Sequence, residues 1–206
     1  FRTSSALEST NLHAFANRQD ISLPGGQKSG WITYPGLFAG GGLDVMTNVL
    51  LTVLLAAFDR SKNSAQAVIR SRARVLDFCC GSGVIGAALI QRWPRLRLSL
   101  LDADAVALCA ARANVPSASV CLSDAWASLP RKPRFDLIVS NPPVHVGLSS
   151  DLGVLISLIR GAAVRLRPGG SLWFVCQEYV PARSIFEEAT RCAAERGAKA
   201  IFLDAS

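Results

Sequence analysis

The stretch that decides the fold is "RVLDFCCGSGVIGAALIQRW", residues 74–93. It begins with a short apolar run typical of a buried strand and ends in a helical pattern from residue 83 onward. Between the two, Gly81, Gly83 and Gly86 have the spacing Gly-x-Gly-x-x-Gly. Glycines in such a place let the backbone turn tightly and approach a ligand, with a helix N-terminus directly behind. The stretch therefore predicts a strand, a tight turn and a helix.

The same alternation of short β-type runs and helical patterns continues to the end of the chain. This order is typical of a parallel sheet with right-handed crossovers and helices on both faces, so we expect a doubly wound α/β fold. The helix expected at 151–166 should pack one face on the sheet. The apolar residues of this face, at helical spacing, are Val154, Leu155, Leu158, Ile159, Ala162 and Leu166. Strands are expected at 74–79, 95–102, 118–122, 135–140, 171–177 and 199–204, and helices at 83–93, 105–114, 151–166 and 184–195.

The first seventy residues have a weaker pattern. A glycine-rich connection at 30–42 leads into a buried helix near 43–58, and the first twenty residues show too little pattern to assign. We therefore expect 1–70 to be a partly irregular entry or cover segment and 71–206 to be the main domain, within one compact domain overall. Because the sequence begins with Phe1, we interpret it as a fragment or a processed product, and a targeting segment ahead of it stays an open question.

Composition narrows the class of protein. The chain has 206 residues, of which 50% are apolar, enough for one substantial core. Its longest apolar run, at 49–58, is far shorter than the roughly 20 residues that cross a bilayer, so no membrane partner is expected. The six cysteines, at 79, 80, 109, 121, 176 and 192, show no paired metal-ligand spacing. We expect a reducing, cytoplasmic environment with no disulfide and no metal.

Three acidic residues follow the expected strands, where ligands bind in doubly wound sheets. Asp77 ends the first strand, and Asp102 lies about 20 residues beyond the glycines, where a carboxylate can accept hydrogen bonds from ribose hydroxyls. Asp124, after the third strand, suits an adenine amino group or, equally well, an ordinary helix N-cap. Up to this point the pattern fits both a dinucleotide and S-adenosylmethionine.

The fourth strand favours methyl transfer. In "FDLIVSNPPVHVG", residues 135–147, an apolar strand stops at Asn141, Pro142 and Pro143, a stiff elbow in which the prolines donate no N–H. The side-chain oxygen of Asn141 and the carbonyl of Pro142 can each accept one proton of a planar amine and so orient its nitrogen. We predict Asn141 and Pro142 as catalytic residues that act by alignment, which can be worth roughly 7–11 kcal/mol of barrier.

From about Tyr34 onward, the sequence resembles the catalytic domain of class I S-adenosylmethionine-dependent methyltransferases, and among them the small-subunit ribosomal RNA guanine-N2 methyltransferases. The resemblance is carried by "YPGLFAGGGLDVMTNVLL", "VLDFCCGSGVIG", "LDADAVALCAARAN", "FDLIVSNPPVHVG", "LIRGAAVRLRPGGSLWFV" and "VPARSIFEEA". It implies a Rossmann-like, mostly parallel seven-stranded sheet, S-adenosyl-L-methionine as cofactor, and ribosomal RNA or a ribosomal particle as partner.

The resemblance also implies roles for particular residues. Cofactor-binding residues would be Asp77, Cys79, Gly81 and Gly83 in the loop, Asp102 at the ribose, Asp124 at the adenine, Asp44 and Thr47 near the methionine end, and Asn141. Substrate-binding residues would be Pro143, Val144 and His145. His145 could position the base or a phosphate, or cap the loop.

Three departures from the family pattern matter. Cys79 replaces a usual glycine and would fit if its φ were negative, and Val144 replaces an aromatic residue that stacks on the target base. Val146 replaces the Asp of a His-Asp-Gly element. Bacterial relatives tend to carry a degenerate second copy of the domain in front, for which this chain is too short.

The net charge of +7 suggests binding to nucleic acid, but its distribution is uneven. Eleven of the 22 Lys and Arg residues precede expected strands and so lie on the edge opposite the site, while Lys28, Arg60, Lys62 and Arg183 are candidates nearer to it. RNA wrapped around the domain, another part of a ribonucleoprotein, and a merely solvated rim all fit. The eleven are Arg70, Arg72, Arg74, Arg92, Arg95, Arg97, Arg131, Lys132, Arg134, Arg165 and Arg167.

The leading hypothesis is therefore methylation of a guanine N2 amine in ribosomal RNA. Alternatives are methylation of adenine N6, a protein glutamine amide or a small amine, and a non-catalytic cofactor-binding subunit, which the missing aromatic at position 144 favours. A nicotinamide oxidoreductase stays formally open.

Overall fold

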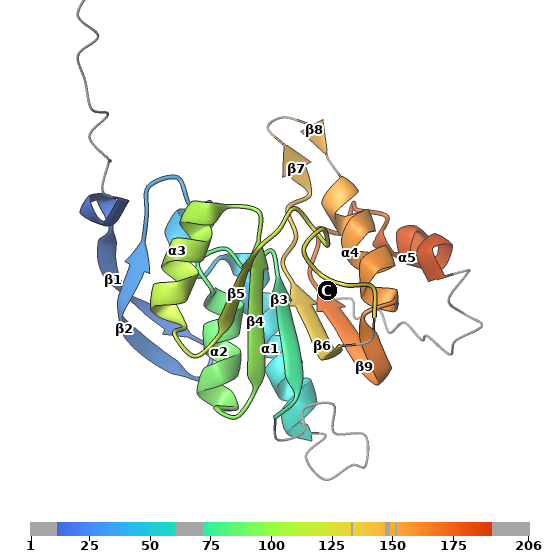
Figure 1. Ribbon diagram of the computed structural model, residues 1–206, viewed down its shortest axis with the longest axis horizontal. Helices are drawn as coiled ribbons and strands as arrows, with labels where there is room; N and C mark the ends of the chain where they lie inside the picture. Colours follow the sequence, from blue (N-terminus) through green and yellow to red (C-terminus); the bar gives the residue numbers. More distant parts are fainter. Residues whose placement is uncertain (1–11, 61–71, 133, 147–148, 151, 191–206) are drawn as a thin grey trace, which may run out of the picture.

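A five-stranded parallel sheet forms the centre of the protein (Figure 1). The computed structural model describes residues 12–60, 72–132, 134–146, 149–150 and 152–190. The strand order is β5-β4-β3-β6-β9, so the order reverses between β3 and β6 and the doubly wound prediction is confirmed. The strands are β3 (Arg74–Phe78), β4 (Arg97–Asp102), β5 (Ser119–Leu122), β6 (Phe135–Ser140) and β9 (Leu166–Phe174). The described sheet has five strands rather than seven, and the strand expected at 199–204 lies outside the described residues.

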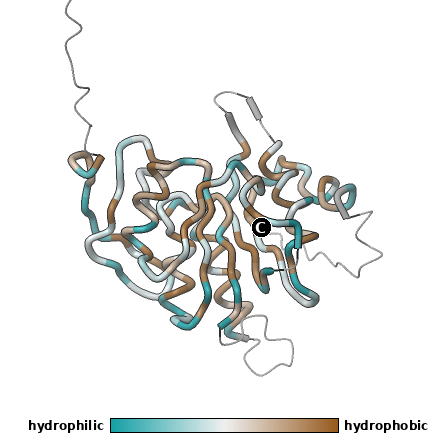
Figure 2. Tube along the Cα trace, viewed as in Figure 1, coloured by the Kyte–Doolittle hydropathy of each residue, from teal (hydrophilic) through white to brown (hydrophobic). Residues whose placement is uncertain are grey.

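Helices cover both faces of the sheet because its strand side chains alternate between two cores. Val75 and Leu100 pack with α1, α2 and α3 on one face, whereas Leu76 and Ile138 pack with α4 and α5 on the other. Figure 2 shows the central strands as mostly hydrophobic, as expected for strands buried on both sides. The helices are α1 (Val45–Arg60), α2 (Val84–Arg92), α3 (Ala105–Asn114), α4 (Gly153–Ala163) and α5 (Ala182–Thr190).

An antiparallel hairpin precedes the first helix, which the sequence pattern did not predict. It consists of β1 (Asn17–Leu23) and β2 (Gly26–Thr33), flanked by the short 3-10 helices η1 (Leu12–Phe15) and η2 (Phe38–Gly41). The available signal was Pro24-Gly25, a dipeptide that marks turns. Side chains of β2 pack on Ala107 and Ala110 of α3, so the hairpin widens the helical layer on that side.

The strand β9 starts earlier than expected. Helix α4 ends at Ala163, so Leu166 belongs to β9 and not to the apolar face of the helix. Phe135 is paired with Leu166 and Leu137 with Ser171, so the Arg-Pro-Gly-Gly segment bulges out of the ladder. The centre of the predicted apolar face of α4 is confirmed, since Leu155, Leu158, Ile159 and Ala162 are buried.

The parallel strands give the sheet two different edges. We call the edge where the strands begin the amino edge and the opposite edge the carboxyl edge; the short strands β7 (His145–Val146) and β8 (Ser149–Ser150) project beyond the carboxyl edge at the top of Figure 1. No helix within the described ranges is both long enough and apolar enough to span a membrane. The same ranges contain no group of three or more His, Cys, Asp or Glu residues placed to hold a metal.

Candidate active site

The glycine loop between β3 and α2 forms the centre of the carboxyl edge. Gly81 and Gly83 adopt left-handed torsions, with φ of 54° and 91°. A Cβ atom on Gly83 would lie 3.1 Å from Val115, and one on Gly86 would lie 2.7 Å from Leu100. The loop therefore needs glycine both for its torsions and for the close approach of α2 to its neighbours.

Cys79 corrects one expectation. Its φ is +59°, so it takes a left-handed conformation, which glycine adopts most readily, rather than a negative φ. Burial, aided by the charges of Asp102 and Asp77, raises the pKa of its thiol above the usual range. Burial likewise raises the pKa of the Cys80 thiol. Because only a thiolate is a good nucleophile, neither cysteine suits covalent chemistry.

Asp102 connects the end of β4 to the glycine loop. Its Oδ2 accepts a hydrogen bond of 2.8 Å from the N–H of Gly81, and its Oδ1 accepts one of 2.9 Å from the N–H of Asp104. Asp104 in turn caps α3 by accepting from the N–H groups of Val106 and Ala107. The carboxylate of Asp102 is only half-buried, so its remaining lone pairs can accept hydrogen bonds from a ligand at the loop.

Asp77 is fully buried behind the loop. Its Oδ2 accepts a 3.0 Å hydrogen bond from the N–H of Gly86, while its Oδ1 has no hydrogen-bond partner within the described structure. Burial raises the pKa of this carboxyl to about 8, against the lowering effect of the Gly86 bond and with a smaller contribution from the charge of Asp102. A buried acid that is incompletely paired is typical of functional sites rather than of optimised cores.

The Asn141 side chain is held from one side. Its Nδ2 donates a 3.0 Å hydrogen bond to Thr47 Oγ1 and lies 3.3 Å from Asp44 Oδ2. Since a carboxylate only accepts, the group facing Asp44 must be the NH2 of the amide. The Oδ1 atom of Asn141 therefore points the other way, with its lone pairs available.

Asp44 holds Asn141 while capping α1. Its Oδ1 accepts hydrogen bonds of 2.9 Å from the N–H of Met46 and 3.2 Å from the N–H of Thr47. The helix N-terminus thus fixes the carboxylate, and the carboxylate fixes the Asn141 amide. The structure places Asp44 and Thr47 together against Asn141, whereas their predicted role at the methionine end of a cofactor stays a prediction.

The elbow after Asn141 is less open than expected. Pro142 is buried and Pro143 exposed, but Val144 is only 5% exposed and packs in the core with α4 and α5. Burying an apolar side chain of this size in the core is stabilising. The predicted roles of Pro143, Val144 and His145 at a substrate stay predictions. His145 lies in β7, in register with Ser150.

Asp124, predicted to read an adenine, stands apart from the other acids. It is exposed after β5, and its carbonyl accepts a 3.0 Å hydrogen bond from the N–H of Ala127, which closes a turn. Its carboxylate has no hydrogen bond to any described residue. The adenine role stays a prediction.

Two residues that the sequence did not single out join the site to the hairpin. Ser82 Oγ donates a 2.7 Å hydrogen bond to the Gly41 carbonyl, which fixes the entry segment against the glycine loop. The buried side chain of Asn114 accepts from the N–H of Ile32 at 2.7 Å and donates to the carbonyls of Ile32 and Ser82. Ser82 could have been found from its place between two loop glycines, but no local signal marks Asn114.

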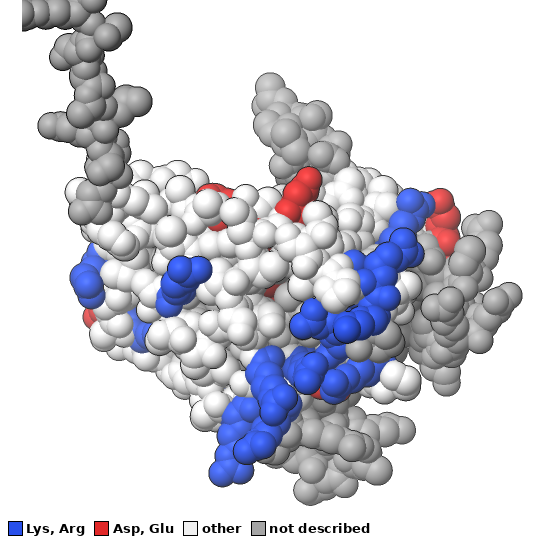
Figure 3. Space-filling model, in the orientation of Figure 1, with Lys and Arg blue, Asp and Glu red and all other residues white. Residues whose placement is uncertain are grey.

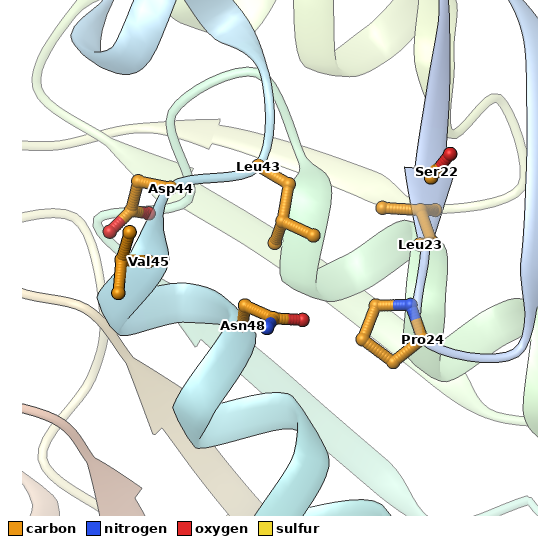
Figure 4. Close-up of a pocket in the computed structure, with 7 residues that line it drawn as sticks. All are labelled: Ser22, Leu23, Pro24, Leu43, Asp44, Val45 and Asn48. Atoms are coloured by element: carbon orange, nitrogen blue, oxygen red, sulfur yellow. The ribbon is translucent and has the colours of Figure 1, made fainter.

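A hollow opens beside Asp44, between the hairpin and the start of α1 (Figure 4). In the figure, Asn48 points toward Pro24 across the hollow, while the Asp44 carboxylate points away from it. The hollow shares only Asp44 with the site just described, so the site is better defined by its hydrogen bonds. The lining residues are Ser22, Leu23, Pro24, Leu43, Asp44, Val45 and Asn48.

The acidic side chains of the carboxyl edge restrict the ligand. Asp77 lies just behind this edge and, with its pKa raised to about 8 by burial, is mostly protonated at pH 7. Asp44, Asp102, Asp104 and Asp124 lie along the edge, and ionised carboxylates only accept hydrogen bonds. Such a set repels a pyrophosphate and suits a cationic ligand that offers hydroxyl and amino donors. The arrangement therefore counts against a dinucleotide.

The family model for the methyltransferase small domain matches residues 29–201, which include part of the entry segment, the glycine loop and the Asn-Pro-Pro elbow. The chain belongs to this family. Curated relatives include the ribosomal RNA small subunit methyltransferase C of Salmonella typhi, 36% identical over 160 residues, which are 76% of this chain and 42% of the relative. The protein of the same name from Salmonella enteritidis matches to the same extent. The chain thus spans less than half the length of these members.

Solved structures agree with the family assignment. A T. thermophilus 16S rRNA N2 methyltransferase, in complex with AdoMet and guanosine, superposes with a TM-score of 0.72 at 25% identity, covering 85% of this chain and 46% of that one. A ribosomal protein L11 methylase from Lactobacillus delbrueckii has a TM-score of 0.54 at 21% identity, covering 77% of this chain and 72% of that one. The second likeness supports the fold alone.

Proposed function

We propose that this chain is the catalytic domain of an S-adenosylmethionine-dependent enzyme that methylates the N2 amine of a guanine in small-subunit ribosomal RNA. The proposal rests on the Asn141 amide, which Asp44 and Thr47 hold so that its oxygen is free to accept a hydrogen bond. The curated relatives are named as methyltransferases of small-subunit ribosomal RNA, which supports the RNA substrate. The T. thermophilus enzyme is named as an N2 methyltransferase and contains guanosine, which supports the acceptor.

The residues at the elbow would orient the amine. An amine conjugated with a purine ring is a poor nucleophile with two N–H donors, and Asn141 Oδ1 and the Pro142 carbonyl would each accept one of them. The amide cannot turn, because its NH2 group is bound to Thr47 and Asp44. The two oxygens thus fix the direction of the nitrogen lone pair, and alignment rather than acid–base chemistry lowers the barrier.

The residues of the carboxyl edge fit the proposed cofactor. S-adenosylmethionine, when bound, supplies a methyl group on a positively charged sulfur, and it also has an ammonium group and ribose hydroxyls. Asp102 would accept from the ribose and Asp124 from the adenine amine, while the buried Asp77 Oδ1 is an acceptor without a partner near the glycine loop. Acidic groups also favour a cation electrostatically.

Position 144 holds a buried Val in place of the aromatic residue that usually stacks on the target base. Stacking would therefore need an aromatic residue from elsewhere in the chain. Phe38 is 73% exposed at the start of η2, whose Gly41 is bonded to Ser82 of the glycine loop. Stacking on an aromatic ring contributes about 1–3 kcal/mol per base. We assign stacking on the target base to Phe38. With this assignment, the missing aromatic residue at position 144 no longer favours a non-catalytic subunit.

The deciding experiment measures transfer of a labelled methyl group to RNA. Asn141→Ala should abolish incorporation while S-adenosylmethionine binding, measured by calorimetry, persists. Asn48→Ala, which removes an exposed amide from the first turns of α1, is the matched control and should leave incorporation intact. Digestion of the wild-type product with ribonuclease or protease identifies the acceptor. Label that survives ribonuclease but not protease would overturn the RNA assignment.

A further inference from the structure

Basic side chains gather on the amino edge, away from the candidate active site. Of the eleven predicted there, Arg70 lies outside the described residues, and Arg165 is buried against Trp126, where it donates to the carbonyls of Gly161 and Leu129. Figure 3 shows Lys and Arg in a nearly continuous band that runs from the bottom of the view toward its upper right, and the lower part of this band lies where the strands begin. The nine that remain are Arg72, Arg74, Arg92, Arg95, Arg97, Arg131, Lys132, Arg134 and Arg167.

The sheet forces these charges close together. Arg74 and Arg97 are register partners on β3 and β4, and the N–H of Arg134 bonds the carbonyl of Arg165 just before β9. Because neighbouring strands are about 4.8 Å apart, the starts of β4, β3, β6 and β9 span about 15 Å. Like charges at this spacing repel one another, and a bound polyanion would relieve the repulsion.

Few acidic groups neutralise the band. Asp136 pairs with Arg167 at 3.2 Å and also accepts from the N–H of Arg74, and Asp59 pairs with Arg92. Five exposed cations of the band have no ion-pair partner within the described part of the chain, Arg72 among them. The other four are Arg95, Arg97, Arg131 and Lys132.

The carboxyl edge has the opposite charge. Its four ionised aspartates, Asp44, Asp102, Asp104 and Asp124, would repel phosphates, and Figure 3 shows acidic groups near the top of the view. A polyanionic substrate of the proposed enzyme therefore gains no attraction from that rim around Asn141. The attraction has to come from another surface, and the amino edge is about 17–20 Å away across strands of five or six residues.

The kind of nucleic acid follows from the residues that the edge lacks. Single strands are bound by aromatic rings on which bases stack, together with cations. The exposed large apolar side chains in the described residues, Phe15, Phe38, Val45, Leu122 and Tyr179, all lie outside the segments of this edge. A surface of cations without stacking rings fits helical RNA, whose bases face inward and whose phosphates face outward.

We propose that the amino edge binds the phosphate backbone of an RNA helix that neighbours the target nucleotide. The inference rests on the proposed function, because it assumes that the substrate is structured RNA. Two surfaces then share the work: the amino edge holds the RNA through its charge, and the carboxyl edge receives one base. The edge would position RNA for catalysis without taking part in methyl transfer.

The test compares pairs of substitutions in RNA binding across a salt series. Arg95→Gln/Arg97→Gln and Arg131→Gln/Lys132→Gln each remove two charges from the band, and Arg18→Gln/Arg112→Gln removes two exposed charges from the hairpin and α3. The probes are a small-subunit ribosomal RNA transcript and a 20-bp RNA duplex. Each lost phosphate contact should lower the slope of log K against log salt by about 0.7–0.9, so each edge pair should lower it by roughly 1.5.

The edge pairs should also bind RNA at least tenfold more weakly at physiological salt, while the control pair and S-adenosylmethionine binding stay at wild-type values. An unchanged slope in both edge pairs, or an equal loss in the control pair, would overturn the proposal. Preserved RNA binding with lost binding to an acidic ribosomal protein would overturn it in favour of a protein partner. If the wild type binds RNA in this way but transfers no methyl group to it, the proposed function fails and the binding surface stands.

Discussion

Replacing Asp77 with Asn should change how the stability of the protein depends on pH. In the folded state, burial raises the pKa of this carboxyl to about 8, compared with 3.8 for an exposed one. Between these values the folded state binds more protons than the unfolded state, so the free energy of unfolding falls as pH rises. Below pH 3.8 both states are protonated and the penalty is absent; above pH 8 it is complete.

The magnitude follows from the same shift. One pKa unit corresponds to 1.36 kcal/mol, so the whole span from 3.8 to about 8 gives an upper limit of about 6 kcal/mol. Asn has nearly the same shape and keeps an oxygen to accept from Gly86, but it has no charge to bury. Asp77→Asn should therefore be more stable than the wild type at pH 8, and the advantage should shrink toward pH 4.

The assay is urea unfolding of both proteins at half-unit steps from pH 4.5 to 9. Subtracting the wild-type free energy of unfolding from that of the variant at each pH removes the contributions of all other titrating groups. The matched control is Asp124→Asn, which removes an exposed carboxylate. A difference that is constant over this range would refute the argument that desolvation dominates at Asp77. If Asp77 serves the cofactor as proposed, the stabilised variant should also bind S-adenosylmethionine more weakly.

Three further predictions concern neighbouring residues. Thr47→Val removes the hydroxyl that accepts from Asn141, so it should lower kcat about fivefold to tenfold without changing the dissociation constant of the cofactor. Thr47→Ser, which keeps the hydroxyl, should restore kcat. A change confined to cofactor affinity would instead support the methionine-end role. Because Cys79 has a left-handed φ of +59°, Cys79→Gly should be more stable than Cys79→Ala by about 1 kcal/mol in urea unfolding, although Ala is usually the more stabilising of the two residues. Equal stabilities of the two variants would contradict the left-handed conformation at this position. Phe38→Ala should raise KM for RNA about fivefold or more without changing S-adenosylmethionine binding. The control Phe15→Ala, which removes another exposed ring, should leave KM unchanged. Equal effects of the two substitutions would exclude stacking on Phe38.

The strengths and failures of the sequence patterns have physical causes. The order of strands and helices was predictable, because side-chain period and glycine spacing act over a few residues. The hairpin was missed because β1 has an exposed, largely polar sequence with little alternation, and only Pro24-Gly25 marked its turn. The start of β9 was misplaced because a Pro-Gly-Gly segment normally ends a strand, whereas here it bulges out of a ladder that Leu166 has already begun.

The candidate site divides in the same way. The sequence alone determined that acids and an Asn-Pro-Pro elbow follow the strands, since parallel strands bring their carboxyl ends to one edge. Only the tertiary structure decided what those groups can do. It turned the Asn141 amide through contacts with residues almost a hundred positions away, buried Asp77, and drew Val144 into the core. Hydrogen-bond direction and desolvation depend on which distant segments pack together, and no local pattern encodes that.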